Sequence, residues 1–190
     1  MITGGSALGL ESKRQRKAYV RVVSHVAVQF ESSAPKYSST AIMFGPEDAR
    51  GLQFPHQDPL VISVDVAQCL LRRVLVDGGS SADVIFLDAF RKMQIPMDRL
   101  TRSDLPLLGF GGQPITAVGK IPLQVVFGEG SNNRVEDIIF DVVDVPYQYN
   151  AILGRSTINK SEAVIHHNYL TMKMPGPTDI IVVSGEQCVA

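Results

Sequence analysis

One short stretch, Val74 to Ala82, constrains this chain more than any other. It reads VLVDGGSSA: an apolar, β-branched run ends at a single acid, Asp77, and two glycines and two serines follow at once. Such a run is typical of a buried strand, and glycine permits close approach of the backbone and unusual dihedral angles. A strand that delivers one carboxylate into so tight a loop indicates acid–base chemistry at a rigid strand end.

The composition favours one globular domain. The chain has 190 residues, of which 45% are hydrophobic and 19% are charged, which suffices for a real core. A net charge of −1 gives no electrostatic reason to expect nucleic acid. Two cysteines, Cys69 and Cys188, are too few for a disulfide framework and predict a reducing, cytoplasmic location. We expect no membrane span and no signal peptide, because the chain lacks the apolar runs that both require.

The chain divides into three parts by composition. Residues 1–40 are basic and Ser-rich and predict a connector, residues 41–175 predict the folded domain, and residues 176–190 predict a C-terminal tail. The basic segment 13–21 is interpreted as a solvated face, with weak contact to nucleic acid as the alternative. Pro175-Gly176-Pro177 marks the expected end of the domain.

The central part alternates between apolar and polar residues in short runs. This pattern predicts a hairpin around 67–69 and two short helices at 83–93 and 156–163, the second with Ser156 as its N-cap. We expect strands at 60–66, 70–76, 105–110, 115–118, 121–127, 135–143, 151–153 and 164–174. Many short strands at this spacing predict a mainly all-β, closed or partly closed barrel.

The chemistry of one carboxylate on such a loop suits half of an aspartic peptidase. That mechanism needs two carboxylates close enough to share one proton, because two like charges a few ångströms apart cannot both ionise. The chain carries a single Asp-x-Gly-Ser element, formed by Asp77, Gly79 and Ser80. A homodimer would bring in the second aspartate across a two-fold axis.

Two motifs carry a resemblance to a known family. The sequence DGGSSA at 77–82, followed by a short helical run, and YNAILGR at 149–155 resemble the retropepsin-like protease region of plant Ty3/Gypsy-type LTR retrotransposon gag-pol polyproteins. The likeness extends from about 54 to 174, with FPHQD at 54–58 and YLTMKM at 169–174 as flanking pieces.

That resemblance implies a fold and a function. The expected fold is a retropepsin-like acid protease barrel with a flap hairpin and two short helices. The expected activity is that of a homodimeric aspartic endopeptidase that cleaves a polyprotein, without cofactor, metal or membrane. The resemblance also implies site roles. It matches Asp77 to the catalytic aspartate and Ser80 to a position that can bond the carboxylate. The active-site loop is Gly78, Gly79 and Ser80, the flap is Gly109, Phe110, Gly111 and Gly112, and the loop-supporting residues are Ile152, Leu153 and Gly154.

One position departs from the family pattern. Active members carry Thr or Ser directly after the aspartate, and this chain has Gly78. In active members of the family, that hydroxyl links the loops of the two protomers. Its absence here removes a hydrogen bond worth roughly 0.5–1.5 kcal/mol at each of two symmetric positions. The alternative function is therefore a catalytically decayed module for dimerisation or interaction, in which Asp77 is idle.

A serine hydrolase is the other alternative. Gly78 to Ala82 nearly matches the Gly-x-Ser-x-Gly elbow, with Ser80 as the nucleophile. Asp141 or Asp144, and then His166 or His167, follow in a suitable chain order. Ala82 replaces the final glycine, however, and the chain lacks alternating βαβ units. The adjacent histidines would point to opposite faces of a strand, so they predict no metal site, and Arg155 is interpreted as structural.

Overall fold

The computed structural model describes residues 3–4, 36–103, 106–109 and 113–190. The elements below belong to one compact unit. The basic segment 13–21 and most of the expected connector lie outside the described residues. Within the described part of the chain, no helix is long and apolar enough to cross a membrane.

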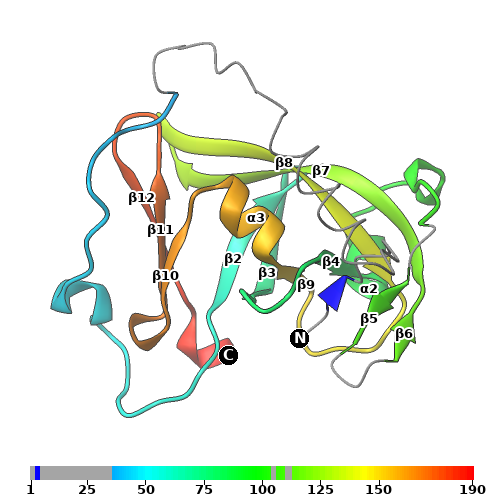
Figure 1. The fold of residues 1–190 in the computed structure, drawn as a ribbon, viewed down its shortest axis with the longest axis horizontal. Helices are drawn as coiled ribbons and strands as arrows, with labels where there is room; N and C mark the ends of the chain where they lie inside the picture. Colours follow the sequence, from blue (N-terminus) through cyan, green and yellow to red (C-terminus); the bar gives the residue numbers. More distant parts are fainter. Residues whose placement is uncertain (1–2, 5–35, 104–105, 110–112) are drawn as a thin grey trace, which may run out of the picture. The chain divides into compact units, whose positions relative to one another are not determined.

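Six strands close into a barrel in the order β2-β3-β9-β4-β8-β7 (Figure 1). The pairs β3–β9 and β4–β8 are parallel, and the other neighbours are antiparallel. The mainly-β closed barrel predicted from the sequence is confirmed. Its strands are β2 (Val61–Val66), β3 (Cys69–Val76), β4 (Asp83–Phe86), β7 (Ala117–Glu129), β8 (Asn132–Val143) and β9 (Ala151–Leu153).

The barrel strands follow the period of two that the sequence shows. Buried and exposed residues alternate along β7 and along the first part of β8, because one face of each strand points into the core. The predicted hairpin between β2 and β3 is confirmed. It turns at Ala67 and Gln68, whose φ angles of 50° and 66° suit the tight turns that join twisted antiparallel strands.

Two small sheets flank the barrel. One contains β10 (Val164–His166), β11 (Thr171–Pro175) and β12 (Ile180–Ser184), and the other contains β1 (Thr3–Gly4), β5 (Leu107–Leu108) and β6 (Pro114–Ile115). The short helices are α2 (Leu87–Lys92) and α3 (Arg155–Lys160). Single turns of 3-10 helix occur at η1 (Pro46–Ala49), η2 (Met97–Arg99), η3 (His167–Tyr169) and η4 (Gln187–Val189).

Two predicted elements differ from the structure. The expected helix 83–93 begins as strand β4 and becomes helical only at Leu87. Strand β4 lies between β8 and β9 and is buried on both faces, which gives a continuous apolar run that periodicity cannot distinguish from a helix. The expected strand 164–174 is interrupted by η3, where Leu170 adopts a left-handed conformation with φ 44°.

The C-terminal segment also differs from the expectation. Residues 176–190 were expected as a tail, but they contain β12, which pairs with β11 over its whole length. Ile181 in β12 is only 2% exposed, so burial of its side chain explains why the segment folds onto the domain.

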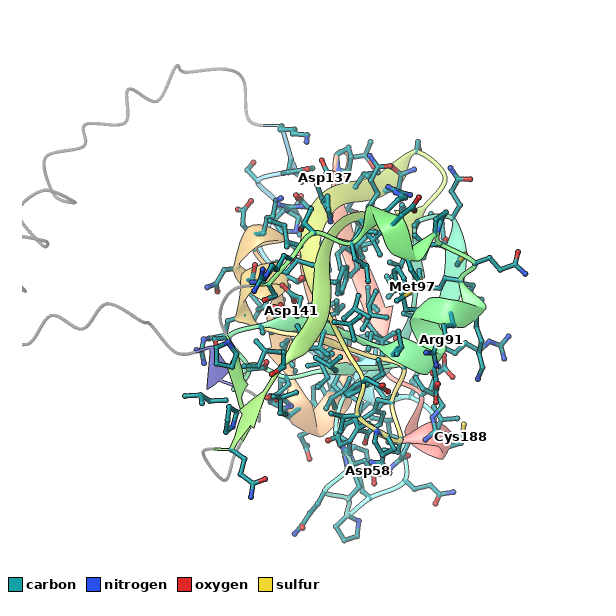
Figure 2. All side chains as sticks on the ribbon, turned by 90° about the vertical axis from the view of Figure 1, so that its right-hand side faces the viewer. Asp58, Arg91, Met97, Asp137, Asp141 and Cys188 are labelled. Atoms are coloured by element: carbon teal, nitrogen blue, oxygen red, sulfur yellow. The ribbon has the colours of Figure 1, made fainter. Side chains whose placement is uncertain are left out.

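Side chains fill the space enclosed by the strands (Figure 2). The largest fully buried side chains include Phe90 of α2, Phe127 of β7 and Phe140 of β8. A second, smaller apolar cluster contains Val84, Phe86 and Ile152. The two clusters hold two strands next to the Asp77 loop. Strand β4 follows that loop in the chain, and β9 pairs with the strand that precedes it.

Candidate active site

Asp77 follows directly after β3, and its main chain is held by the neighbouring strand β9. Its N–H donates to the Leu153 carbonyl at 2.9 Å, continuing the parallel pairing of β3 with β9. The carboxylate Oδ1 accepts the Gly79 N–H at 2.8 Å. The residue is half-buried, so the carboxylate is oriented by the loop and still reaches solvent.

The loop after Asp77 is a tight turn closed by its own backbone. The Ser80 N–H donates to the Asp77 carbonyl at 3.0 Å. The Ser80 hydroxyl is fully buried, donates to the Ala82 carbonyl at 2.8 Å and accepts from the Ala82 N–H at 3.3 Å. The hydroxyl therefore stabilises the turn, and Gly79, rather than the Ser80 side chain, supplies the bond to the carboxylate.

Gly78 stands at the exposed tip of this loop. A Cβ atom built on Gly78 would meet nothing within 4 Å, and its φ lies outside the left-handed region. The fold of one chain therefore leaves room for a side chain here, and glycine is not required by the local backbone.

The loop-supporting residues of β9 lie beneath the turn. Ile152 and Leu153 are buried and pair with Leu75 and Val76 of β3. A Cβ atom on Gly154 would lie 2.4 Å from the Ala82 carbonyl oxygen and 2.9 Å from that of Ser80. Because both neighbours are backbone atoms, only glycine lets the chain after β9 approach the loop so closely.

Arg155, the first residue of α3, holds the loop from the outside. Its N–H donates to the Ser80 carbonyl at 2.9 Å. Its guanidinium donates to the carbonyls of Gly78 and Gly79 at 3.4 and 3.2 Å. These bonds give Arg155 a structural role at the site. The N-cap of α3 is Gly154, not the expected Ser156, because the helix begins one residue before that serine.

Asp83, at the start of β4, is a buried carboxyl directly behind the loop. It is 2% exposed, and its Oδ1 accepts the Gly154 N–H and the Thr157 hydroxyl, both at 2.7 Å. Burial raises the pKa of Asp83 above its ordinary value, although the bonds from Thr157 and Gly154 act in the opposite direction. Asp83 therefore joins β4 to the start of α3.

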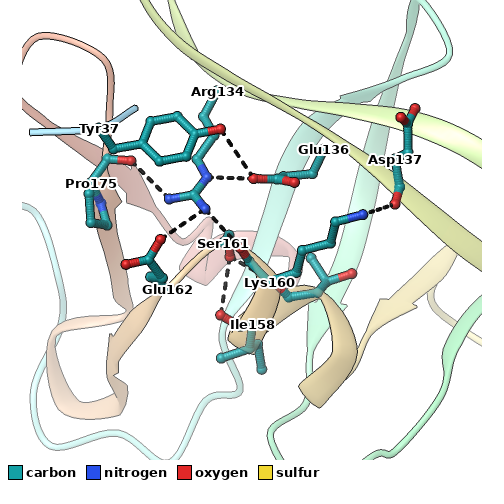
Figure 3. Close-up of polar contacts among 10 residues, drawn as sticks. Tyr37, Arg134, Glu136, Asp137, Ile158, Lys160, Ser161, Glu162 and Pro175 are labelled. Atoms are coloured by element: carbon teal, nitrogen blue, oxygen red, sulfur yellow. Dashed lines mark hydrogen bonds and ion pairs between the residues drawn. The ribbon is translucent and has the colours of Figure 1, made fainter. Parts of the chain in front are cut away.

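The far end of α3 is held by a buried arginine on β8 (Figure 3). Arg134 donates to the Lys160 carbonyl at 2.7 Å and pairs with Glu136 at 2.7 Å and Glu162 at 3.3 Å. The ring of Tyr37 lies 3.8 Å from the guanidinium carbon. Helix α3 is thus tied at both ends, which fixes the segment that supports the Asp77 loop.

A depression of about 500 Å³ opens beside Asp77. Its walls include Leu60, Leu75, His56 and His167. The His56 side chain is 5% exposed, and its Nε2 lies 3.1 Å from the Asn168 carbonyl. The site therefore combines one oriented carboxylate with an accessible, partly apolar hollow.

The expected flap coincides with a hairpin, as far as the described residues extend. Strands β5 and β6 pair antiparallel, and the Gly109 N–H donates to the Gln113 carbonyl at 3.0 Å. The tip residues Phe110, Gly111 and Gly112 lie outside the described residues.

The geometry argues against a serine nucleophile. Ser80 has no exposed surface, and its hydroxyl bonds only main-chain atoms of Ala82 among the contacts found in the described residues. Asp141 (Figure 2) instead faces Lys120 at 3.5 Å, and burial raises its pKa. His166 accepts the Tyr169 N–H. In the part of the chain that the structure describes, no cluster of His, Cys, Asp or Glu could hold a metal ion.

The sequence did not single out Asp83 or Thr157. Asp83 follows Asp77 by six positions and stands directly before the apolar run at 84–87. An acid at the start of a buried apolar run was the available signal, because acids are rarely fully buried unless they are bonded.

No protein-family model matches this chain, and no curated protein matches it. Among solved structures, the chain is similar to the retroviral protease-like domain of Ddi1 from Leishmania major, with a TM-score of 0.49 and 15% identity over 68% of this chain and 95% of that one. It is also similar to EIAV protease complexed with the inhibitor HBY-793, with a TM-score of 0.45 and 17% identity over 60% of this chain and 99% of that one. A likeness at this level concerns the fold and not the chemistry.

Proposed function

We propose that this chain is an aspartic endopeptidase that acts as a homodimer in the maturation of a retrotransposon polyprotein. The observation that carries the proposal is the setting of Asp77. Its backbone is fixed by Leu153, its carboxylate accepts the Gly79 N–H at 2.8 Å, and it borders an open hollow. A carboxylate held in this way is oriented for proton transfer and accessible to a substrate.

The chemistry requires a second copy of the chain. One ionised Asp77 takes a proton from water, the water oxygen attacks the scissile carbonyl carbon, and the protonated Asp77 of the other copy gives its proton to the carbonyl oxygen. Collapse of this intermediate breaks the C–N bond as a proton passes to the leaving amine. The open space around Gly78 supports an approach of the second loop to the first.

The proposed substrate is an extended polypeptide. It would lie between the β5–β6 hairpin and the paired aspartates as an added strand. The reaction needs no cofactor or metal, and it gives no role to a membrane or to nucleic acid. The free thiols of Cys69 and Cys188 support a reducing, cytoplasmic location.

The second candidate is an interaction module with an idle Asp77. Gly78 favours this second candidate, because glycine has no side chain that could link the loops of the two copies. The two candidates agree on the dimer and differ on cleavage.

Cleavage of a peptide library at mildly acidic pH tests the proposal. We expect pepstatin-sensitive cleavage by the purified dimer. Asp77→Asn should lower the rate by at least about a hundredfold, with an unchanged circular dichroism spectrum and dimer mass. Equal cleavage by Asp77→Asn would exclude the aspartic mechanism. A dimer without any cleavage would favour the interaction module.

Gly78→Thr tests the missing hydroxyl directly. A Cβ atom at this position meets nothing within 4 Å in one chain, and threonine restores a hydroxyl that can bond across the dimer. We expect dimerisation to strengthen by about tenfold, in line with one to two net hydrogen bonds, as measured by sedimentation equilibrium. Gly78→Val is the matched control, since it adds a similar side chain without a hydroxyl.

A further inference from the structure

Asp77 is held to β9 by its backbone, and the loop that follows Asp77 is held to the start of α3. Its N–H bonds the Leu153 carbonyl, and the Arg155 N–H bonds the Ser80 carbonyl, each at 2.9 Å. Gly154 lies between these two bonds, in close approach to the backbone of the loop. The position of the Asp77 carboxylate therefore depends on what fixes Gly154.

Asp83 is the side chain that fixes Gly154. Its Oδ1 accepts the Gly154 N–H and the Thr157 hydroxyl at 2.7 Å each. Thr157 is 2% exposed, and its carbonyl accepts the Ser161 hydroxyl at 2.8 Å. One carboxyl oxygen thus binds both the N-cap of α3 and the first turn of that helix.

The cost of this arrangement indicates a function beyond packing. The second oxygen of Asp83, Oδ2, is buried and has no hydrogen-bond partner among the described residues. A buried carboxyl without full hydrogen bonding is unfavourable, and an apolar side chain would fill a core position at lower cost. An apolar side chain, however, could not accept hydrogen bonds from the Gly154 N–H and the Thr157 hydroxyl.

We propose that Asp83 is a positioning residue for Asp77, acting through Gly154 and Thr157 on the segment that carries the Asp77 loop. The inference rests on the proposed function for its catalytic consequence, but its structural consequence can be measured without activity. Asp83 touches neither the substrate nor the reacting atoms, and it acts on the orientation of the carboxylate that does.

Hydrogen exchange of single amides tests the proposal in the full chain. The Asp77 and Arg155 amides report the two bonds that hold the loop, and the amides of β11 serve as an internal reference. Thr157→Val, which removes the hydroxyl donor, should raise exchange at Asp77 and Arg155 by about five- to tenfold and leave β11 unchanged. Thr157→Ser keeps the donor and should match the wild type.

Asp83→Asn and Asp83→Ala form the second pair. Asparagine retains a carbonyl oxygen that can accept both bonds, whereas alanine removes it. We expect the exchange increase in Asp83→Ala and its absence in Asp83→Asn. If Asp83→Ala does not fold, the Thr157 pair still decides. Unchanged exchange at Asp77 in Thr157→Val, or an equal increase in β11, would overturn the proposal.

Kinetics separate this inference from the proposed function. In an active dimer, Thr157→Val should lower kcat by about tenfold while KM stays within about twofold, and Thr157→Ser should restore kcat. A KM change at constant kcat would contradict a positioning role. If the wild type does not cleave but the exchange pattern appears, Asp83 still positions Asp77, and only the peptidase proposal fails.

Discussion

Gly78 and Gly154 stand in the same site and meet opposite steric conditions. A Cβ atom on Gly78 would point into open space, whereas one on Gly154 would lie 2.4 Å from the Ala82 carbonyl oxygen. The sequence alone treats them as two glycines in two motifs. The structure distinguishes a glycine that the fold requires from one that it merely tolerates.

Paired alanine substitutions test this distinction. Gly154→Ala should lower the free energy of unfolding by at least about 2 kcal/mol, since the new methyl group meets backbone atoms that cannot move aside. Gly78→Ala should change it by less than about 0.5 kcal/mol. Urea denaturation followed by circular dichroism measures both values. A Gly154→Ala variant as stable as Gly78→Ala would contradict the packing described here.

At the level of elements, an ion pair fastens the segment before the barrel to β11. The Lys173 ammonium lies 2.7 and 2.8 Å from the two carboxylate oxygens of Asp48 in η1, and 2.8 Å from the Met43 carbonyl oxygen. Both side chains are about nine-tenths buried. The hydrogen bond from Lys173 lowers the pKa of Asp48 below its ordinary value of 3.8.

The lowered pKa predicts a loss of stability in acid. An acid whose pKa is lower in the folded state stabilises the fold above its ordinary pKa, and this contribution is lost as the pH falls through the lowered value. We expect the wild type to exceed Asp48→Asn in unfolding free energy at pH 6, with the difference vanishing well below pH 3.8. Asp88→Asn is the control, because the Asp88 side chain is 85% exposed. Chemical denaturation across this range measures the difference. A gap that persists in strong acid would disprove the ionic origin.

Strand β4 shows why single elements were predicted unevenly. The long strands β7 and β8 have one buried face, so their alternation is visible in the sequence. All four residues of β4 are buried, because the main apolar core covers Ile85 on one face and the second cluster covers Val84 and Phe86 on the other. Pairing with β8 and β9 makes this segment a strand, and the residues of β4 alone do not reveal that pairing.

At the scale of the whole molecule, the folded unit extends beyond the predicted domain at its C-terminal end. Strand β12 continues the small sheet, and its Ile181 enters the main apolar core. Glu186 and Gln187 then bond back to Ser63 and to Asp58. The segment 176–190 therefore contributes packing and polar contacts to the domain.

Truncation tests this boundary. A chain that ends at Pro175 loses β12 and its core isoleucine, and burial of one such side chain alone contributes about 2–5 kcal/mol, a large part of a typical domain's stability. We expect it to lack a cooperative thermal transition. A chain that ends at Gln187 retains these contacts and should melt within about 3 °C of the full chain. Equal melting of both truncated chains would show that the segment is dispensable.

The sequence predicted those parts of the candidate site that depend on local motifs. The run into Asp77 and the following glycines specified a strand, a carboxylate and a tight turn, because β propensity and glycine conformation are local properties. The sequence could not show that the Ser80 hydroxyl turns inward, or that Asp83 binds the N–H of Gly154. Those partners are distant in the chain or set by the shape of the turn.

By itself, the sequence determined a mainly-β barrel, the hairpin between β2 and β3, and the strand end that presents Asp77, since hydrophobic periodicity and turn residues act over a few positions. Only the tertiary structure decided the strand identity of β4, the incorporation of β12, the backbone contact that makes glycine necessary at position 154, and the bonds that Arg155 and Asp83 make around the Asp77 loop. These features depend on parallel pairing, close backbone contact and burial of a carboxyl. Each arises between segments that meet only when the barrel closes.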